Sequence, residues 1–229
     1  MTDVAVARPS STVVLVRESG NGPEVLLMRR HERSAFGGAH AFPGGVLEDS
    51  DSLVEDHCAG ITPREADDML DIDHGLAYFS AAIRELFEES GVLLAKTAGR
   101  GADLDAARDA LNAGTLDWRS FVVANDVQLQ CDALRYFSYW ITPEALPRRF
   151  STRFFLAAMP EDQDSRSSLA RTGSKFQLRC WSFVLGEDNA ANAICLLVTD
   201  EERDKPCSTC FCCAPLSAAR SSPFSSCWR

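Results

Sequence analysis

Residues 84–92 read Arg-Glu-Leu-Phe-Glu-Glu-Ser-Gly-Val, and this stretch says more about the fold than any other part of the chain. In a helix, Glu85, Glu88 and Glu89 stand at positions i, i+3 and i+4, so their three carboxylates share one face. The opposite face is apolar and would anchor the helix to a core through Ile83, Leu86 and Phe87. Three like charges this close repel one another unless a cation neutralises them. Because Mg²⁺ takes oxygen ligands, the pattern indicates either a divalent-metal site or a solvated acidic face.

A glycine-rich turn precedes this stretch, since residues 38–45 read Gly-Ala-His-Ala-Phe-Pro-Gly-Gly. Pro43 fixes its own φ and favours an extended backbone at Phe42, while Gly44 and Gly45 can adopt conformations closed to other residues. Such a turn can bring backbone carbonyls and amides close to a metal ion or a phosphate group. A Pro-Gly-Gly sequence alone usually marks an ordinary turn, but together with the acidic helix it favours the metal site.

The two segments together resemble the signature of the Nudix hydrolases, which runs from a glycine through a glutamate to Arg-Glu-apolar-x-Glu-Glu-x-Gly-apolar. Residues 84–92 match the second half at every specified position, and Gly45 matches the first half. Asp51 stands where the signature has its first glutamate. Residues 46–75 form a long insertion between the glycine turn and the helix, and we expect the acidic side chains of this insertion to be solvated.

A long insertion at this place is typical of a branch of the family that resembles the coenzyme A diphosphatases. That branch also shares the sequence at the glycine turn, the strand before it and two later runs. In this chain the corresponding stretches are Leu-Leu-Met-Arg-Arg at 26–30, residues 38–45, Trp-Ile-Thr-Pro at 140–143 and Arg-Arg-Phe-Ser-Thr-Arg-Phe-Phe at 148–155. The resemblance covers roughly residues 12–160 and favours this branch.

The resemblance implies an α/β fold, namely a Nudix-type α/β/α sandwich with a mixed sheet, whose C-terminal part is incomplete or irregular in this chain. The residue pattern agrees, because strand-like and helix-like segments interleave without a regular βαβ repeat. Turn residues at 18–23 predict a hairpin, and Gly91 is placed to end the signature helix. The expected strands are 12–16, 25–28, 92–94, 134–141 and 153–158, and the expected helices are 64–70, 76–90 and 102–125.

The chain divides into a flexible N-terminus at 1–11, a Nudix hydrolase domain at 12–160 and an atypical Cys/Ser-rich tail at 161–229. Most of the nine cysteines fall in the tail, and four of them crowd into one short run at Cys207, Cys210, Cys212 and Cys213. A tetrahedral zinc site usually draws on two separated ligand pairs, and no histidine lies nearby, so zinc is disfavoured. We expect the tail to be disordered, or non-native because the reading frame of the domain is lost.

The composition of the chain disfavours some classes of function. The chain has 229 residues, is 45% hydrophobic and carries a formal net charge of −10, which suits one folded domain with an appendage. It has no long basic stripe to follow a nucleic acid backbone and no apolar run near the ~20 residues needed to span a bilayer, so we expect neither partner. The N-terminus lacks the charged-then-apolar order of a secretory signal, so we expect a cytoplasmic or otherwise intracellular protein with mostly reduced cysteines.

The resemblance also implies roles for individual residues. Glu88, Glu89 and the carbonyl of Gly45 would bind Mg²⁺ or Mn²⁺, and Glu85 would add a ligand or act as the base on water; which glutamate is the base is left open. Arg84 would serve catalysis by orienting Glu85 or Glu88, although an ordinary i,i+4 pair with Glu88 is the simpler alternative. Because guanidinium groups grip phosphates, Arg29, Arg30, Arg149 and Arg153 are predicted to bind substrate together with Gly44, and Arg148 is a further candidate. His40 is a candidate metal ligand or base, although a loop histidine is more often structural.

The expected reaction is hydrolysis of the diphosphate linkage in a small nucleoside diphosphate derivative, with divalent ions stabilising the crowded negative charge. Coenzyme A or acyl-coenzyme A is the favoured substrate and would give 3′,5′-ADP and a 4′-phosphopantetheine. ADP-ribose or a dinucleotide is the alternative substrate. A non-catalytic Nudix-fold protein that binds nucleotides is the alternative from another class, and the oligomeric state is left open.

Overall fold

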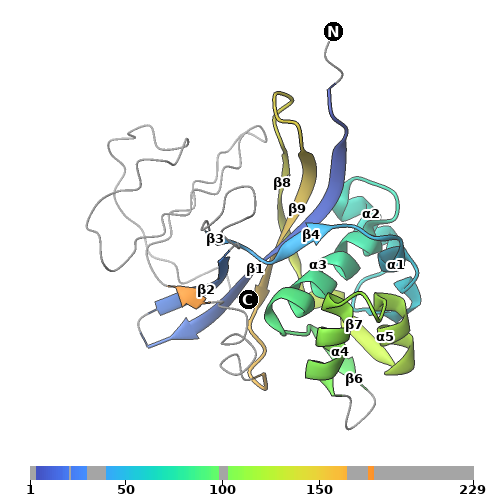
Figure 1. Ribbon diagram of the computed structural model, residues 1–229, viewed down its shortest axis with the longest axis vertical. Helices are drawn as coiled ribbons and strands as arrows, with labels where there is room; N and C mark the ends of the chain where they lie inside the picture. The colour runs from blue at the N-terminus through green and yellow to red at the C-terminus, as the bar shows by residue number, and fades with distance from the viewer. Residues whose placement is uncertain (1–3, 21, 30–39, 98–102, 164–174, 178–229) are drawn as a thin grey trace. The chain divides into compact units, whose positions relative to one another are not determined.

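The computed structural model describes residues 4–20, 22–29, 40–97, 103–163 and 175–177 (Figure 1). All of these residues belong to Met1–Leu178, the first of two compact units of the chain. The described residues form one sheet of seven strands, a second sheet of three strands, and helices that gather on one side of the larger sheet (Figure 1).

The larger sheet is built around β1 (Ala7–Ser19), in which Val13 and Leu15 are fully buried and share one face. β1 forms an antiparallel hairpin with β2 (Gly22–Arg29), and its other side pairs in parallel with β9 (Arg149–Ala158). Parallel and antiparallel pairs in one sheet confirm the predicted mixed sheet.

Four further strands complete the larger sheet. β8 (Arg135–Ile141) pairs with β9, and β10 (Lys175–Gln177) pairs with β2, so the main path runs β10-β2-β1-β9-β8. The two short strands β3 (His40–Ala41) and β4 (Gly44–Val46) pair with β2 and β1. β4 therefore holds the glycine turn against the central strand.

Five α-helices lie within the described residues: α1 (Asp49–Ser52), α2 (Pro63–Leu70), α3 (Gly75–Ser90), α4 (Leu104–Asn112) and α5 (Trp118–Ala124). α2 starts one residue ahead of the predicted 64–70, with Pro63 in its first turn and Thr62 as its side-chain cap. α3 is the signature helix, and at 16 residues it is ~24 Å long. None of the described helices is both long and apolar enough to cross a bilayer.

The smaller sheet consists of β5 (Cys58–Ala59), β7 (Val127–Gln130) and β6 (Ala95–Thr97), with β7 in the middle. A 3-10 turn, η1 (Glu55–His57), leads into β5, and another, η2 (Cys131–Ala133), follows β7. Because β5 belongs to the predicted insertion, the insertion is built into this sheet and is not an external loop.

Aromatic side chains fill the core on both sides of α3. Phe79 lies 4.8 Å from Phe155 of β9, measured between ring centroids, and joins the helix to the larger sheet. Phe87 stacks on Phe121 of α5 at 5.4 Å, and Trp118 packs on the same Phe121 ring at 5.5 Å. Since all five rings are buried, they fix how α3 is rotated about its axis and which of its faces is free for chemistry.

The end of α3 follows the prediction. Gly91 has a left-handed φ of 80° and donates its N–H to the carbonyl of Phe87, which is the usual way for a helix to end at glycine. The predicted strand at 92–94 is wrong, since the strand β6 starts at Ala95. The reason is visible at Leu93, whose N–H and C=O bond to the side-chain amide of Gln163 at 2.9 and 2.6 Å, in place of a neighbouring strand.

Three other predicted boundaries also change. Residues 7–11, assigned to a flexible N-terminus, belong to β1 and pair with β9. The single helix expected at 102–125 is two helices, because Asp117 accepts the N–H of Ser120 at 2.9 Å and caps a new helix start. β9 begins at Arg149, ahead of the predicted Arg153, since its first residues pair with the extended start of β1.

The prediction for the tail at 161–229 falls almost wholly outside the described residues. Of the few tail residues that are described, Lys175–Gln177 form a strand paired with β2, so this short piece of the tail is regular. The second helical layer of the predicted α/β/α sandwich is not among the helices of the described ranges, which lie together beside one face (Figure 1).

Candidate active site

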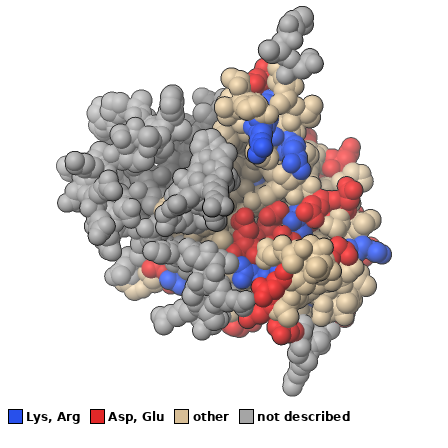
Figure 2. Space-filling model, in the orientation of Figure 1, with Lys and Arg blue, Asp and Glu red and all other residues tan. Residues whose placement is uncertain are grey.

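The fold brings the acidic face of α3 against the glycine turn. The N–H of Gly44 donates to Glu89 Oε2 at 3.1 Å. Gly45 pairs with Ser11 of β1, and a Cβ atom added to Gly45 would overlap the carboxylate of Glu85. Only glycine permits this close approach of backbone and carboxylate, which explains its presence here. Acidic side chains gather on the face of the molecule over α1 and α3 (Figure 2).

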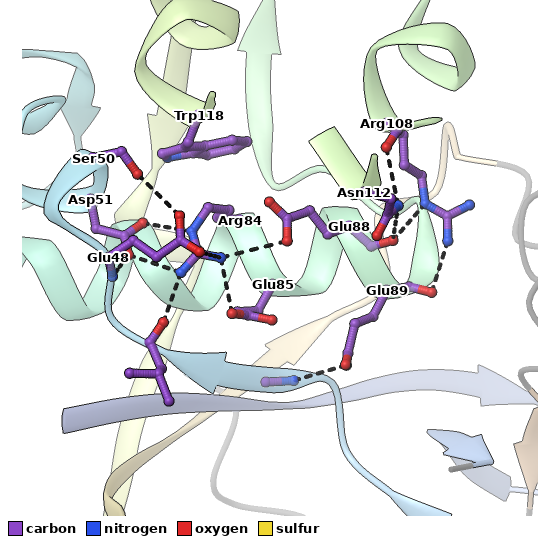
Figure 3. Close-up of polar contacts among 12 residues, drawn as sticks. Glu48, Ser50, Asp51, Arg84, Glu85, Glu88, Glu89, Arg108, Asn112 and Trp118 are labelled. Atoms are coloured by element: carbon purple, nitrogen blue, oxygen red, sulfur yellow. Dashed lines mark hydrogen bonds and ion pairs between the residues drawn. The ribbon is translucent and has the colours of Figure 1, made fainter. Parts of the chain in front are cut away.

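Arg84 lies in the middle of this site and is almost completely buried, with 1% of its side chain exposed (Figure 3). Its Nε and Nη2 donate to the two carboxylate oxygens of Asp51, both at 2.9 Å. Its Nη1 donates to Glu85 Oε1 at 2.9 Å, and its Nη2 also donates to the carbonyl of Val46 at 3.0 Å. A single guanidinium therefore ties together α1, β4 and α3.

These contacts go beyond the ordinary i,i+4 pair considered for Arg84. Its Nη1 lies 3.5 Å from Glu88 Oε2, which is longer than its bond to Glu85. Because the guanidinium is buried and its donors are directed to Asp51, Glu85 and Val46, Arg84 is placed to position a carboxylate and is shielded from solvent.

Asp51 corrects the expectation for the insertion, whose acidic residues were predicted to be solvated. This residue is fully buried, at 0% exposed. Besides Arg84, its carboxylate accepts the N–H of Glu48 at 2.8 Å and the hydroxyl of Ser80 at 3.5 Å. Trp118 in turn donates its Nε1–H to Ser80 Oγ at 3.0 Å. The buried charge is thus paired and hydrogen-bonded, which a carboxylate in a core requires.

Burial and like charge shift the protonation of the glutamates. Burial raises the pKa of Glu88 to about 7, with the charge of Arg84 opposing the shift and the charge of Glu85 adding to it. Burial also raises the pKa of Glu85, although the charge and hydrogen bond of Arg84 lower it. Burial alone would lower the pKa of Arg84, but its hydrogen bonds to Asp51 and the surrounding carboxylates raise it, so Arg84 stays charged.

The backbone of Glu88 and Glu89 is held from behind by α4, a feature that the sequence analysis missed (Figure 3). Arg108 donates from Nε to the carbonyl of Glu88 and from Nη2 to the carbonyl of Glu89, both at 2.8 Å. Asn112 Nδ2 adds a third bond to the carbonyl of Glu88 at 3.0 Å. These donors satisfy carbonyls that the end of α3 leaves open, and a cation there also suits the helix dipole.

The predicted phosphate-binding arginines lie in different surroundings in the structure. Arg29 ends β2 opposite His40 of β3, next to the glycine turn, while Arg30 lies outside the described residues. Arg149 donates to the carbonyls of Thr142 and Ala5 at 3.0 and 2.8 Å. Arg148 is exposed.

Arg153 is buried at 6% exposed and lies between the rings of Tyr78 and Tyr139, 4.5 and 4.7 Å from their centroids. It also donates to the carbonyl of Leu70 at 3.2 Å. Tyr78 precedes Glu85 by about two turns of α3, which puts Arg153 ~10 Å along the helix from that carboxylate. Both Arg149 and Arg153 thus have partners inside the chain, and their role in substrate binding stays a prediction that these contacts do not support.

The donor set fits a hard divalent cation in its chemistry. Carboxylate and backbone carbonyl oxygens are what Mg²⁺ and Mn²⁺ prefer, and α3 presents the carboxylates beside the Gly44–Gly45 backbone. Within the described residues, no three acidic, His or Cys side chains already converge as a ligand set. Glu85, Glu88 and Glu89 would therefore have to close around an ion by side-chain rotation.

Comparison with known proteins agrees with the residue pattern. No family model matches the chain. A curated Caenorhabditis elegans protein described as "Putative nudix hydrolase 7" is 26% identical over 156 residues, which is 68% of this chain and 45% of that protein. The chain thus spans less than half the length of this curated relative. The crystal structure of a NUDIX hydrolase from Alicyclobacillus acidocaldarius superposes with a TM-score of 0.51 and 26% identity, covering 68% of this chain and 71% of that one. In sequence and in fold, the chain is thus similar to Nudix hydrolases.

Proposed function

We propose that this chain is a Mg²⁺- or Mn²⁺-dependent hydrolase that cleaves the diphosphate linkage of a nucleoside diphosphate derivative. The observation that carries the proposal is the meeting of Glu85 and Glu89 with the Gly44–Gly45 backbone, with Glu88 beside them. A buried arginine stands behind this group and holds Glu85 in place. A purely nucleotide-binding protein has no need for such a set of carboxylates.

The proposed mechanism depends on the negative charge of the diphosphate group. Water attacks one phosphorus atom of the linkage, one P–O bond forms, the bridging P–O bond breaks, and the other phosphate leaves. Divalent cations supply most of the stabilisation of the negative charge that develops on the phosphate oxygens. Glu88, Glu89 and the carbonyl of Gly45 are the residues proposed to hold them.

The remaining residues would orient the carboxylates and accept the proton of the attacking water. Arg84 fixes Glu85 through the 2.9 Å bond to Oε1 and favours its ionised form against the effect of burial. Either Glu85 or Glu88 takes the proton of the attacking water. Their positions on successive turns of a rigid helix keep both within reach of the same phosphate group.

Coenzyme A or an acyl-coenzyme A is the substrate we favour, with 3′,5′-ADP and a 4′-phosphopantetheine as products. The support for this choice is the resemblance of residues 26–30, 140–143 and 148–155 to the coenzyme A branch, together with the long insertion. ADP-ribose or a dinucleotide contains the same linkage and is the alternative substrate. The insertion bears on this choice, since it supplies Asp51 to the site.

The test is to incubate the full chain with coenzyme A, ADP-ribose and NADH in parallel, with Mg²⁺ and then Mn²⁺, and to identify the products by mass spectrometry. Formation of 3′,5′-ADP supports the favoured substrate, whereas AMP with ribose 5-phosphate supports the alternative. Saturable nucleotide binding without any product would assign the chain to the non-catalytic class. Running the reaction in ¹⁸O-labelled water shows which phosphorus is attacked.

A matched pair of variants ties the activity to the site. Glu88→Gln removes a charge but keeps the shape, and should lower turnover by roughly 10²-fold or more, equivalent to about 2.7 kcal/mol of barrier. Glu144→Gln makes the same change at an exposed position of the β8–β9 connection and should leave turnover unchanged. Equal rates in both variants would remove Glu88 from the site.

A further inference from the structure

A buried serine of the central strand contacts both halves of the proposed metal site. Ser11 of β1 is fully buried, at 0% exposed. Its backbone pairs with Gly45 of β4, and its hydroxyl donates to the backbone carbonyl of Tyr78 in α3 at 2.8 Å. A single residue therefore connects the glycine turn with the helix that carries the carboxylates.

The bond to Tyr78 fixes where α3 lies along the strand. In a regular α-helix a carbonyl already accepts the N–H four residues later, so the serine adds a bond that the helix itself does not require. The neighbours of Ser11 on the same face of β1, Val13 and Leu15, are apolar and fully buried. Apolar packing is not directional, whereas a hydrogen bond depends on distance and angle. The hydroxyl of Ser11 therefore defines the position of α3 more sharply than the apolar contacts do.

The clearances between α3 and the glycine turn are small. A Cβ atom added to Gly45 would overlap the carboxylate of Glu85, and one added to Gly44 would overlap the carbonyl of Ser11. The N–H of Gly44 donates to Glu89 Oε2 at 3.1 Å. Since a binding site must hold its groups to within about 0.5 Å, even a small movement of α3 along β1 would separate the carboxylates from the glycine backbone.

We propose that Ser11 is a positioning residue of the metal site, whose hydroxyl holds α3 at the place along β1 where its carboxylates face the glycine turn. Tyr78 and Glu85 are seven residues apart, close to two helical turns, so the bonded residue and the carboxylate lie on the same side of α3. Ser11 acts through α3 and touches neither the cation nor the substrate. The inference rests on the proposed function, because it assigns Ser11 a role in metal binding.

The preceding residue provides a matched control. Ser10 is also buried, at 4% exposed, and its hydroxyl is hydrogen-bonded to Thr152 Oγ1 at 2.7 Å. Because side chains alternate along a strand, Ser10 and Ser11 face opposite sides of the sheet. Thr152 belongs to β9, so the bond of Ser10 joins two strands and does not reach α3. Alanine at either position thus removes one buried hydroxyl from the same strand and leaves the backbone pairing of β1 in place.

The test compares Ser11→Ala, Ser10→Ala and the wild type as full chains, titrated with Mn²⁺ in the absence of substrate and followed by electron paramagnetic resonance. Ser11→Ala should raise the Kd for Mn²⁺ about 10-fold, whereas Ser10→Ala should bind Mn²⁺ like the wild type. Urea unfolding in EDTA should show similar losses of stability in the two variants, which separates the placement of α3 from a general weakening of the fold.

The wild type distinguishes the two ways in which the inference can fail. Mn²⁺ binding by the wild type with equal affinities in Ser11→Ala and Ser10→Ala, whether both are normal or both are weakened, would reject the role of Ser11 alone. A wild type that binds no Mn²⁺ would reject the metal site of the proposed function, and the role of Ser11 with it. Weakened binding in Ser11→Ala alone supports the proposal.

Discussion

Arg84 and Asp51 form a buried, two-bond ion pair across 33 positions of the chain, with both N···O distances at 2.9 Å. The pair joins the signature helix to the insertion, and the third nitrogen of the guanidinium, Nη1, donates to Glu85. The Nudix signature has a glutamate at the position of Asp51, and the aspartate side chain is one carbon shorter. Asp51 still reaches Arg84 because α1 holds the backbone of Asp51 close to α3. The insertion thereby supplies a buried partner to the arginine that holds Glu85.

Replacing Asp51 tests this pair directly. Asp51→Asn removes the carboxylate that makes two bonds to the buried Arg84, leaves Glu85 as its closest remaining counter-ion, and should cost up to about 3–5 kcal/mol of unfolding free energy. Urea unfolding followed by circular dichroism measures the loss. Asp49→Asn on the same helix, at an exposed position, is the matched control and should change stability little. Equal small losses in both variants would mean that the pair contributes nothing measurable.

A second prediction concerns the geometry of Arg84. Arg84→Lys keeps the positive charge but cannot bond Asp51, Glu85 and Val46 at once. Because the lysine lets Glu85 move, kcat should fall roughly 10–100-fold while the KM for substrate changes little. Steady-state kinetics with the preferred substrate separates the two constants. An increase in KM with an unchanged kcat would show that Arg84 acts on substrate binding instead.

The raised pKa of Glu88 predicts a pH dependence of stability in the metal-free chain. The pKa is about 7 in the folded state against an ordinary 4.5, so between these values the folded chain binds more protons than the unfolded chain. Unfolding free energy should therefore fall as pH rises from about 4.5 to 7, by on the order of 2–3 kcal/mol. Urea titrations in EDTA across this range measure the slope.

The control for this prediction is Glu88→Gln, which lacks the titrating group and should have a flatter profile than the wild type. Saturating Mn²⁺ should flatten the wild-type profile too, because a bound cation favours the ionised carboxylate. Parallel pH profiles for the wild type and the variant, both without metal, would exclude Glu88 as the source of the slope.

Arg108 should affect metal binding from outside the carboxylate set. Arg108→Gln removes the two bonds to the carbonyls of Glu88 and Glu89, loosens the last turn of α3 and should weaken Mn²⁺ binding about 10-fold. Calorimetry or electron paramagnetic resonance of Mn²⁺ gives the affinity without any turnover. Arg119→Gln, an exposed position on α5, should bind Mn²⁺ like the wild type. Unchanged affinity in both would leave Arg108 with a structural role alone.

Local sequence patterns were enough to predict some parts of the structure. The helix α3 and its end at Gly91 follow from apolar spacing and from the conformational freedom of one glycine, and both are properties of neighbouring residues. The mixed sheet and the hairpin of β1 and β2 were also predicted. The meeting of the glycine turn with the glutamates was expected from the resemblance, since no local rule brings residue 45 to residue 85.

Other parts depend on partners far away in sequence. Asp51 reads as one more acid in a polar insertion, and only its pairing with Arg84 makes burial possible. Arg108 sits in an amphipathic helix that shows no sign of which carbonyls it will meet. Leu93 looks like a strand residue, yet the side chain of Gln163 takes the bonds that a strand would have used. Such choices are decided by tertiary contacts that override local propensity.

The central strand β1 has a consequence for how the site comes into being. Ser11 pairs with Gly45 on one side and with Arg153 on the other, and its hydroxyl donates to the carbonyl of Tyr78 in α3. A slip of a single residue along β1 would turn Val13 and Leu15 outward and carry the glycines out of step with the carboxylates. The proposed active site is thus assembled together with the sheet, and a chain with β1 misaligned would lack it however well its helices had formed.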